Sequence, residues 1–476
     1  MGDRAAGDTQ TAPSPRSGRP SRAPSPASSQ IPSSAASSTR RQEASWREPS
    51  ARPTPLARLS SPGTGDGIPL WRGLTILVAQ RCRRALAPYV LRTGANSAYV
   101  HLRVVAEFSP GLEGVVAAET AVSEVDGANG RLIYRGGYLI EDLVPVATNE
   151  EVAYLLWHGE LPTQKELEAL RRQMAAARKL NASARGTLAA MDSQTDPMDV
   201  LRTVVSAQGA AKALAKPALE EAIALTAIFP TILGATWRRR QGRDAVEPRD
   251  DLSHAANVLW LMEGKEPEAD KVHLVDTYLV LLADHGLNAS TFAARVVAST
   301  GSDLTSCVVG AIAALKGPAH GGATLAARNM LDKIGSADNA EKWLTEAHAR
   351  HDRFSGFGHR VYRTYDPRAK ILREMAKTAA PDLYKTAART EEVALKILHE
   401  AHPERPNATN VDFWASVVLT GAGIPKELFT TLFATSRVSG WTAHVLESLS
   451  DLRIIRPASR WIGPQPGKKP LQLAKR

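Results

Sequence analysis

From residue 148 to residue 449 the sequence is a succession of helix signals with almost no strand signals between them. Thr148 and Thr163 each stand three residues before a glutamate, and an apolar stripe at helical spacing follows each of them. This pattern is a capping box, in which the threonine and the glutamate satisfy free amide groups at the start of a helix. Asp366-Pro367 predicts another helix start, because aspartate is a good N-cap and proline fits the first helical position. The chain is therefore predicted to be mainly α.

Further helices are predicted from apolar periodicity and from glycine or proline stops. They span about 196–215, 218–239, 252–262, 270–283, 288–300, 303–315, 366–377, 388–401, 410–420 and 426–449. Clear strand signals occur only at 114–124 and 131–135. The turn-rich connector between these two segments predicts a hairpin. The sequence has neither a P-loop nor a dinucleotide glycine fingerprint, and it lacks the β–α alternation of a nucleotide-binding sheet.

Composition divides the chain near residue 104. Residues 1–103 contain 15 arginines, no lysine, 12 of the 30 prolines and five acids, whereas the remaining 373 residues have equal numbers of basic and acidic side chains. The sequence pI of about 9.6 is thus a property of the first segment, and it does not indicate that the body binds nucleic acid. We predict that residues 1–103 are a disordered or non-native extension. Three interpretations stay open: an organelle transit peptide, a basic interaction arm, or translated leader upstream of a start near residue 104.

The cysteine content and the lengths of the apolar runs indicate the cellular compartment expected for the chain. Only Cys82 and Cys307 are present, which excludes a disulfide framework for the body and fits a reducing, cytoplasmic location. No apolar run approaches the ~20 residues that a membrane helix needs, so no membrane attachment is predicted.

Three short motifs place acid–base side chains in glycine-rich or apolar settings. His320 lies between Gly-Pro and Gly-Gly pairs, His359 follows Gly-Phe-Gly, and Asp412 lies in the apolar segment 410–414. Two histidines and a carboxylate can take a proton from a carbon acid while polarising a second carbonyl, so this set favours carbon–carbon bond chemistry over hydrolysis or redox work. Each residue also has a structural interpretation, as a turn histidine or, for Asp412, as a helix cap.

Several arginines lie in apolar surroundings. Arg437 continues a helical stripe of aromatic residues (Phe429, Phe433 and Trp441). A guanidinium there needs an anionic partner, which is either a structural carboxylate or a substrate. Arg368 follows a predicted helix start, and Arg456 lies in a second apolar stretch, so together the arginines suit a small dicarboxylate. His285, after an apolar helix, is placed to reach the same site.

Two histidine pairs have spacings like those of metal ligands (His348 with His351, and His399 with His402). Both lie on charged segments that are predicted to be helices facing solvent, and both lack a third ligand. No metal site is predicted.

These motifs, taken in order, resemble the citrate synthase family. The resemblance runs from about Phe108 to Gly463 and includes 111–115, 133–138, 155–159, 284–292, 365–369, 436–441 and the three acid–base motifs. It implies the family's fold, with a short N-terminal β-hairpin and a large helical domain formed by 104–317 and 418–476. A smaller helical domain, 318–417, would close over the active site.

The resemblance implies a Claisen-type condensation of acetyl-CoA with oxaloacetate, followed by thioester hydrolysis to citrate and CoA, as in the tricarboxylic acid cycle. By position, Asp412 would remove a proton from the acetyl methyl group, His320 would stabilise the enol or enolate, and His359 would polarise and protonate the ketone. The substrate carboxylates would be held by His285, Arg368, Arg437 and Arg456. Acetyl-CoA is a substrate, and no cofactor is implied.

Family members are dimers, or hexamers built from dimers, so the resemblance implies a homo-oligomer in which Arg456 reaches the neighbouring subunit's site. One position departs from the common pattern: many members place Asn-Glu where this chain has Thr324-Leu325. The intact reactive residues favour catalysis over a silent relative that binds citrate or CoA. A 2-methylcitrate synthase, which uses propionyl-CoA, shares every motif and stays an alternative, because one methyl group changes binding by only ~1–3 kcal/mol.

Overall fold

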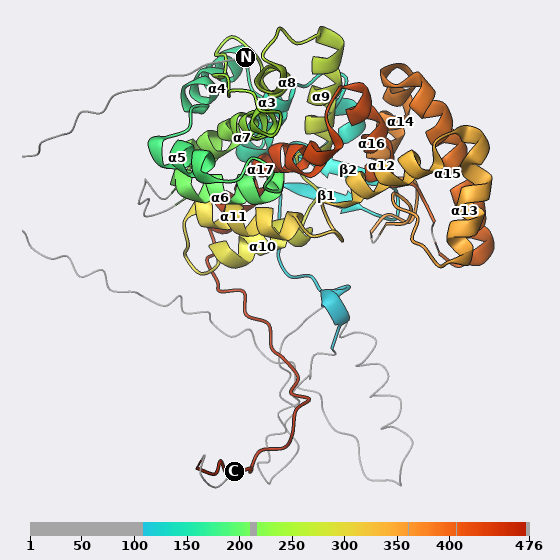
Figure 1. Cartoon of the computed structure of the whole chain (residues 1–476). Coiled ribbons are helices and arrows are strands. Elements are labelled where there is room, and N and C mark those ends of the chain that lie inside the picture. The colour runs from blue at the N-terminus through green and yellow to red at the C-terminus, as the bar shows by residue number, and fades with distance from the viewer. Residues whose placement is uncertain (1–107, 210–216, 360, 406, 473–476) are drawn as a thin grey trace, which may run out of the picture. The chain divides into compact units, whose positions relative to one another are not determined.

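The computed structural model describes residues 108–209, 217–359, 361–405 and 407–472, so the predicted extension 1–103 lies outside the described residues. Helices dominate the described chain, and Figure 1 shows a single small sheet among them. The mainly α class predicted from the sequence is confirmed.

The first half of the body contains α2 (Ile140–Leu143), α3 (Asn149–His158), α4 (Gln164–Ala177), α5 (Ala182–Ala190), α6 (Pro197–Gly209), α7 (Leu219–Arg240), α8 (His254–Glu263), α9 (Ala269–Leu282), α10 (Ala289–Ala298) and α11 (Leu304–Leu315). The second half contains α12 (Ala323–Ile334), α13 (Ala340–Ala349), α14 (Pro367–Ala379), α15 (Pro381–Ala401), α16 (Val411–Gly421) and α17 (Phe429–Ser448). Short 3₁₀ turns are η2 (Pro110–Leu112), η3 (Arg135–Gly137), η4 (Ala337–Asn339) and η5 (Lys426–Leu428).

The predicted helix starts form as capped ends. Both capping boxes are present, at Thr148 before α3 and at Thr163 before α4. Asp366 caps α14 by accepting the Arg368 backbone N–H at 3.0 Å. Three helices, α2, α5 and α12, are absent from the predicted set. The four residues of α2 are too few to show a periodic pattern, and alanines at inward positions weaken the apolar stripes of α5 and α12. The predicted start of α15 at 388 is wrong, since Pro381 occupies its first position.

The sheet has strands β1 (Ser123–Asp126), β2 (Arg131–Tyr134) and β3 (Tyr138–Leu139), antiparallel and in that order. The predicted hairpin is confirmed at its turn, where Asp126 pairs with Arg131. The prediction that the first strand begins at 114 is wrong, because residues 115–120 pair with no strand of the described chain and are mostly exposed. β3 was not predicted, since it is only two residues long.

The hairpin turn contacts the segment that follows His359. The Arg363 backbone N–H donates to the Gly127 carbonyl oxygen at 2.9 Å. A Cβ at Gly127 would lie 2.2 Å from the carbonyl oxygen of Val361, so this close approach requires glycine. The turn therefore supports one wall of the region that contains the predicted site.

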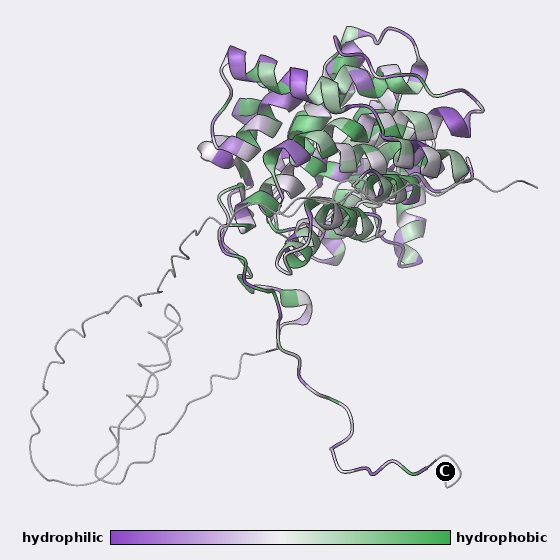
Figure 2. Ribbon diagram, turned by 90° about the vertical axis from the view of Figure 1, so that its left-hand side faces the viewer, coloured by the Kyte–Doolittle hydropathy of each residue, from purple (hydrophilic) through white to green (hydrophobic). Residues whose placement is uncertain are grey.

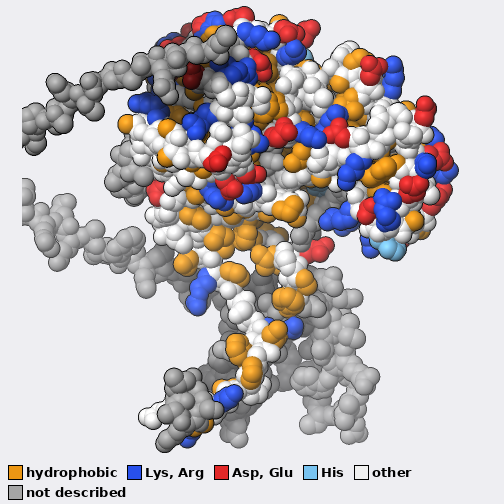
Figure 3. Space-filling view, in the orientation of Figure 1, with side chains coloured by type: hydrophobic (Ala, Val, Ile, Leu, Met, Phe, Trp, Pro, Cys, Tyr) orange, Lys and Arg blue, Asp and Glu red, His pale blue; other side chains and the backbone are white. Residues whose placement is uncertain are grey.

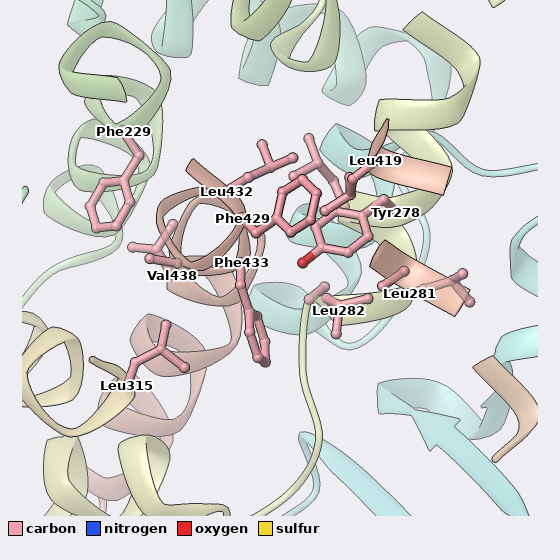
Figure 4. Packing of buried hydrophobic residues seen from close by; sticks show 14 of the residues in the cluster. Phe229, Tyr278, Leu281, Leu282, Leu315, Leu419, Phe429, Leu432, Phe433 and Val438 are labelled. Atoms are coloured by element: carbon pink, nitrogen blue, oxygen red, sulfur yellow. The ribbon is translucent and has the colours of Figure 1, made fainter. Parts of the chain in front are cut away.

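The core is organised around α17, which packs against α3, α7, α9, α10 and α11. Figure 4 shows side chains of α17, including Phe429 and Leu432, between Phe229 of α7 and Tyr278 of α9. Figure 2 shows apolar residues concentrated on the inner faces of the helices, with polar residues outside. This burial places Arg437, also on α17, inside the body and leaves it 1 % exposed.

Among the described residues, one helix is long and apolar enough to cross a membrane, namely α7. Within the body, however, 78 % of its most apolar window is buried against other helices. The helix also contains Pro230 and ends in Arg238, Arg239 and Arg240. We interpret α7 as a core helix. The predicted cytoplasmic location stays a prediction.

Helices α12 to α16 form a connected group. Both α12 and α14 pack on α16, and α13 packs on α15, and Figure 1 shows these helices on one side of the body. α16 also contacts α9, which joins the group to the rest of the molecule. The division into a large domain and a closing domain at 318–417 stays a prediction.

Candidate active site

His285 and His359 come together although 73 residues separate them in the chain. Their rings lie 5.5 Å apart, edge to face. Tyr362 touches both, with its hydroxyl 3.3 Å from His285 Nε2 and its ring 4.7 Å from that of His359. Burial, followed by the field of Arg368, lowers the pKa of His359 to about 4 and that of His285 well below its usual value. Both imidazoles are therefore neutral near pH 7.

The position of the proton on His359 follows from its backbone contacts. The N–H groups of Val361 and Tyr362 donate to His359 Nδ1 at 3.0 and 2.9 Å. An imidazole nitrogen that accepts two hydrogen bonds carries no proton, so neutral His359 carries its proton on Nε2. The Nε2–H group is then a hydrogen-bond donor and a potential acid.

A glycine-rich loop fastens His359 to the start of α16. Gly356 has φ of 91°, and a Cβ there would lie 2.5 Å from the Cβ of Phe413, so the loop requires glycine. The Asn410 N–H donates to the Gly356 carbonyl at 3.0 Å, and its side-chain amide donates to the Gly358 carbonyl at 3.0 Å. These bonds hold the loop of His359 next to the helix turn that carries Asp412.

Asp412 lies in the first turn of α16. Asn410 caps this helix by accepting the Asp412 backbone N–H at 3.1 Å, so the interpretation of Asp412 itself as the cap is wrong. Its carboxylate instead accepts the Thr324 hydroxyl at 2.5 Å. Burial raises the pKa of Asp412, and the Thr324 hydrogen bond and the charge of Arg368 oppose that shift. A carboxylate in such a setting is a stronger base than an exposed one.

His320 sits in the connection between α11 and α12. Its Nε2 lies 2.9 Å from Ser290 Oγ, which also accepts the Trp441 indole N–H at 3.0 Å. Ser290 is in the first turn of α10, and its hydroxyl also lies 2.8 Å from Asn288 Oδ1. Burial, with a smaller effect of Arg437, lowers the pKa of His320 to about 4. This histidine is also neutral near pH 7.

The buried arginines differ in their partners. Arg437 donates from Nε to the Leu282 carbonyl at 2.6 Å and lies over the Phe433 ring, yet no carboxylate of the described chain forms an ion pair with it. Burial lowers the pKa of Arg437 to about 10. Arg368, in contrast, pairs through Nε and NH2 with Asp366, at 3.0 and 2.8 Å. Arg437 therefore has no direct carboxylate partner in the described chain, and only the more distant charge of Asp284 opposes the effect of its burial.

Arg456 lies apart from these residues. It is exposed in the irregular segment 451–472, which leaves the helical body in Figure 1. Nearby, the Ile455 backbone N–H donates to the Ser299 hydroxyl at 3.0 Å. A single chain therefore does not bring Arg456 into the cluster around His359.

A cavity of about 600 Å³ adjoins His359 and Phe357. Its wall is rich in groups that attract anions: Arg353, Arg363, Arg405, His351 and His402. The expectation that His351 and His402 belong to solvent-facing helices is thus incomplete, because α13 and α15 turn their ends toward this cavity. Within the described part of the chain, no group of three potential ligands could hold a metal ion.

The site also contains residues that the sequence predictions missed. Tyr362, Ser290 and Thr324 contact His285, His320 and Asp412, respectively. Ser290 lies inside the singled-out segment 284–292, Tyr362 follows His359 by three residues, and Thr324 follows His320 by four, at the position where the chain departs from the common pattern. The sequence contained no signal for which side chain each of these three residues contacts.

The fold and the site define an α-helical enzyme with a buried carboxylate, three neutral histidines and a buried arginine that forms no ion pair with a described residue. Residues 111–458 match the domain family described as citrate synthase, C-terminal domain, and this chain belongs to the citrate synthase family. It is 44 % identical to a citrate synthase of Haloferax volcanii over 370 residues, covering 75 % of this chain and 96 % of the relative. It is 38 % identical over 366 residues to a 2-methylcitrate synthase of Mycobacterium tuberculosis, covering 75 % and 91 %.

A solved structure has the same fold. It is the citrate synthase of Thermoplasma acidophilum, determined as a ternary complex with carboxymethyl coenzyme A and oxaloacetate. The two chains share 32 % identity with a TM-score of 0.73, and the match covers 78 % of this chain and all of the other.

Proposed function

We propose that this protein condenses acetyl-CoA with oxaloacetate and hydrolyses the resulting citryl-CoA to citrate and CoA. The observation that carries the proposal is the site itself, where a buried base, two neutral histidines and an arginine without a carboxylate partner converge. The acetyl methyl group is a very weak carbon acid. Its deprotonation therefore needs a base together with a group that stabilises the enolate oxygen.

Each of the three acid–base residues has a separate task. Asp412 takes the proton from the methyl group. His320 would stabilise the enol or enolate through Nδ1–H, a tautomer that requires the Ser290 hydroxyl to turn from Asn288 Oδ1 and donate to His320 Nε2. His359 donates its Nε2 proton to the ketone oxygen as the carbon–carbon bond forms. Water then attacks the thioester carbonyl, CoA leaves as the thiol, and the hydrolysis makes the sequence irreversible.

The substrate carboxylates need cations. Arg437 is the principal one, because burial without a carboxylate partner leaves its guanidinium to the substrate. His285 stands beside His359, and the part of the Arg368 guanidinium that Asp366 does not use supplies further donors. These residues would hold oxaloacetate with its ketone next to His359.

We further propose that the cationic cavity beside His359 holds the phosphates of the acyl-CoA. Arg363 is exposed on its rim and has no ion pair to a described residue. Replacing it (Arg363→Ala) should raise KM for acetyl-CoA about tenfold, because a charged hydrogen bond contributes ~1.5–3 kcal/mol and 1.4 kcal/mol is a factor of ten. KM for oxaloacetate should not change. Arg172→Ala is the control, because Arg172 is also exposed but lies on α4 and does not line the cavity.

Exposed apolar side chains at both ends of the described chain support a homo-oligomer. Val116, Trp461 and Ile462 are 86, 74 and 89 % exposed, and Figure 3 shows apolar side chains along the C-terminal segment. Such surfaces usually mark an interface. In a homodimer the segment 451–472 would cover the partner and carry Arg456 to the partner's site. A mass in solution equal to that of one chain would contradict this arrangement.

Closure of the predicted smaller domain, 318–417, over the substrates would exclude water until the carbon–carbon bond has formed. His320 and Asp412 lie near the two ends of this segment, so closure would complete the site. The expectation that no cofactor is needed belongs to the same proposal.

The activity is tested by release of CoA thiol from a mixture of acetyl-CoA, oxaloacetate and protein. We expect release that depends on both substrates, and its absence from a folded protein would overturn the proposed function. The second candidate, 2-methylcitrate synthase, is favoured by the relative of that name. Repeating the assay with propionyl-CoA separates the two, because a higher kcat/KM for propionyl-CoA would favour the second.

A further inference from the structure

The carboxylate of Asp412 has one directional partner within the described chain, Thr324. The Thr324 hydroxyl donates to Asp412 Oδ1 at 2.5 Å. Thr324 is only 2 % exposed and lies in the first turn of α12, which packs on α16. No hydrogen bond or ion pair from a described residue reaches Oδ2. One carboxylate oxygen is therefore engaged, and the other is left for a substrate proton.

We propose that Thr324 is a positioning residue that orients Asp412 so that Oδ2 faces the acyl methyl group. The proposal rests on the proposed function, in which Asp412 is the base. A carboxylate on a short side chain rotates easily about its terminal torsion, and a hydrogen bond to one oxygen selects a single orientation. Thr324 thereby decides which oxygen takes the proton.

The same bond couples the base to the enolate-stabilising histidine. His320 precedes Thr324 by four residues, and two contacts hold the intervening backbone. The Gly321 N–H donates to the Leu315 carbonyl at 2.9 Å, and the Thr430 hydroxyl donates to the Gly321 carbonyl at 3.0 Å. His320 and Thr324 thus share one fixed helix start, and the bond from Thr324 sets the distance from that start to Asp412.

Other polar groups near Asp412 act on it without a direct bond. Arg368 lies on α14 and Asp366 is its N-cap, Arg437 lies on α17, and the Tyr278 hydroxyl is on α9. Their fields influence the proton affinity of the carboxylate, but they do not fix its rotation.

Two further charged residues lie on elements that pack against α16 or α12, but they form contacts with residues other than Asp412. Glu391 of α15 accepts the Trp414 indole N–H and pairs with Arg373. Lys426 of η5 pairs with Asp332 of α12. Thr324 is therefore the group whose removal changes the geometry of Asp412 most directly, and its loss also removes a donor that favours the charged form.

The test compares Thr324→Val, which has the same shape without the hydroxyl, with Thr324→Ser, which keeps the hydroxyl. For Thr324→Val we expect kcat about 10-fold to 100-fold lower, with the dissociation constant for oxaloacetate unchanged. The acid limb of the kcat/KM profile should move to higher pH, because the base then binds its proton more tightly. The deuterium isotope effect with trideuterated acetyl-CoA should increase as proton removal becomes slower.

Thr324→Ser should recover kcat to within about threefold of the original protein, since its hydroxyl can make the same charged bond. Thr420→Val is the matched control. It removes a hydroxyl from α16 that donates to the Ser416 carbonyl, away from Asp412, and kcat should stay unchanged. Thermal unfolding checks each variant, and Thr324→Ala replaces Thr324→Val if the valine variant does not fold.

If kcat fell equally in Thr324→Ser and Thr324→Val, Thr324 would act only through its packing, and the inference would be overturned. An unchanged kcat and acid limb in Thr324→Val would do the same while leaving the proposed function intact. Failure of the original protein to release CoA thiol would overturn both.

Discussion

Replacing Asp412 by asparagine (Asp412→Asn) should lower kcat for condensation by about 100-fold to 10 000-fold, the range typical for loss of a general base. The amide has nearly the shape of the carboxylate but cannot accept the methyl proton. Oxaloacetate binding should be nearly unchanged, because Arg437 and His285, not Asp412, would hold its carboxylates. The measurement is kcat from CoA thiol release, with the oxaloacetate dissociation constant from calorimetry.

A matched control exists in the chain. Asp382 occupies the same position in the first turn of α15 that Asp412 occupies in α16, but it is exposed. Asp382→Asn should leave kcat unchanged. If Asp412→Asn abolished oxaloacetate binding together with kcat, the role of a base that acts after binding would be contradicted.

The second large effect is expected for Arg437→Met, which should raise KM for oxaloacetate about 100-fold or more. The buried guanidinium has no carboxylate partner in the described chain, so its charge is compensated when a substrate carboxylate binds. Methionine fills a similar volume and removes the charge. Because methionine leaves the Leu282 carbonyl without its donor and Asp284 without a nearby cation, we expect a modest fall of the thermal midpoint beside the large change in KM.

Arg178 provides the comparison for this variant. Like Arg437 it is buried and donates to backbone carbonyls, those of Arg249 and Leu252, but it lies at the end of α4 and outside the cluster around His359. Arg178→Met should therefore lower the thermal midpoint without changing KM for oxaloacetate. If Arg437→Met, like Arg178→Met, lowered the thermal midpoint and left KM for oxaloacetate unchanged, Arg437 would be a structural residue.

Predictions from local sequence succeeded where the physical signal is itself local. The capping boxes at Thr148 and Thr163 and the cap at Asp366 each require only residues a few positions apart, and all three form. The failures have the same origin. The segment 115–120 has strand-like residues but pairs with no strand of the described chain, and α12 has an apolar stripe weakened by alanine.

For the site, the sequence identified His320, His359 and Asp412 by type and setting, but each kept a structural alternative. The structure decided between the alternatives through contacts. Asn410, not Asp412, caps α16, and two backbone amides occupy His359 Nδ1. Such contacts depend on angles and distances that a list of residues does not contain.

By itself, the sequence determined the mainly α class and most helix positions, and it singled out the residues proposed for the acid–base chemistry. All of these follow from caps, periodicity and side-chain type, which act within a few residues. The tertiary structure alone decided which groups meet: His285 beside His359, Thr324 on Asp412, and Arg437 without a carboxylate. Each of these depends on the packing of helices that are distant in sequence, and that packing also determines which groups are buried and how far burial shifts their pKa values.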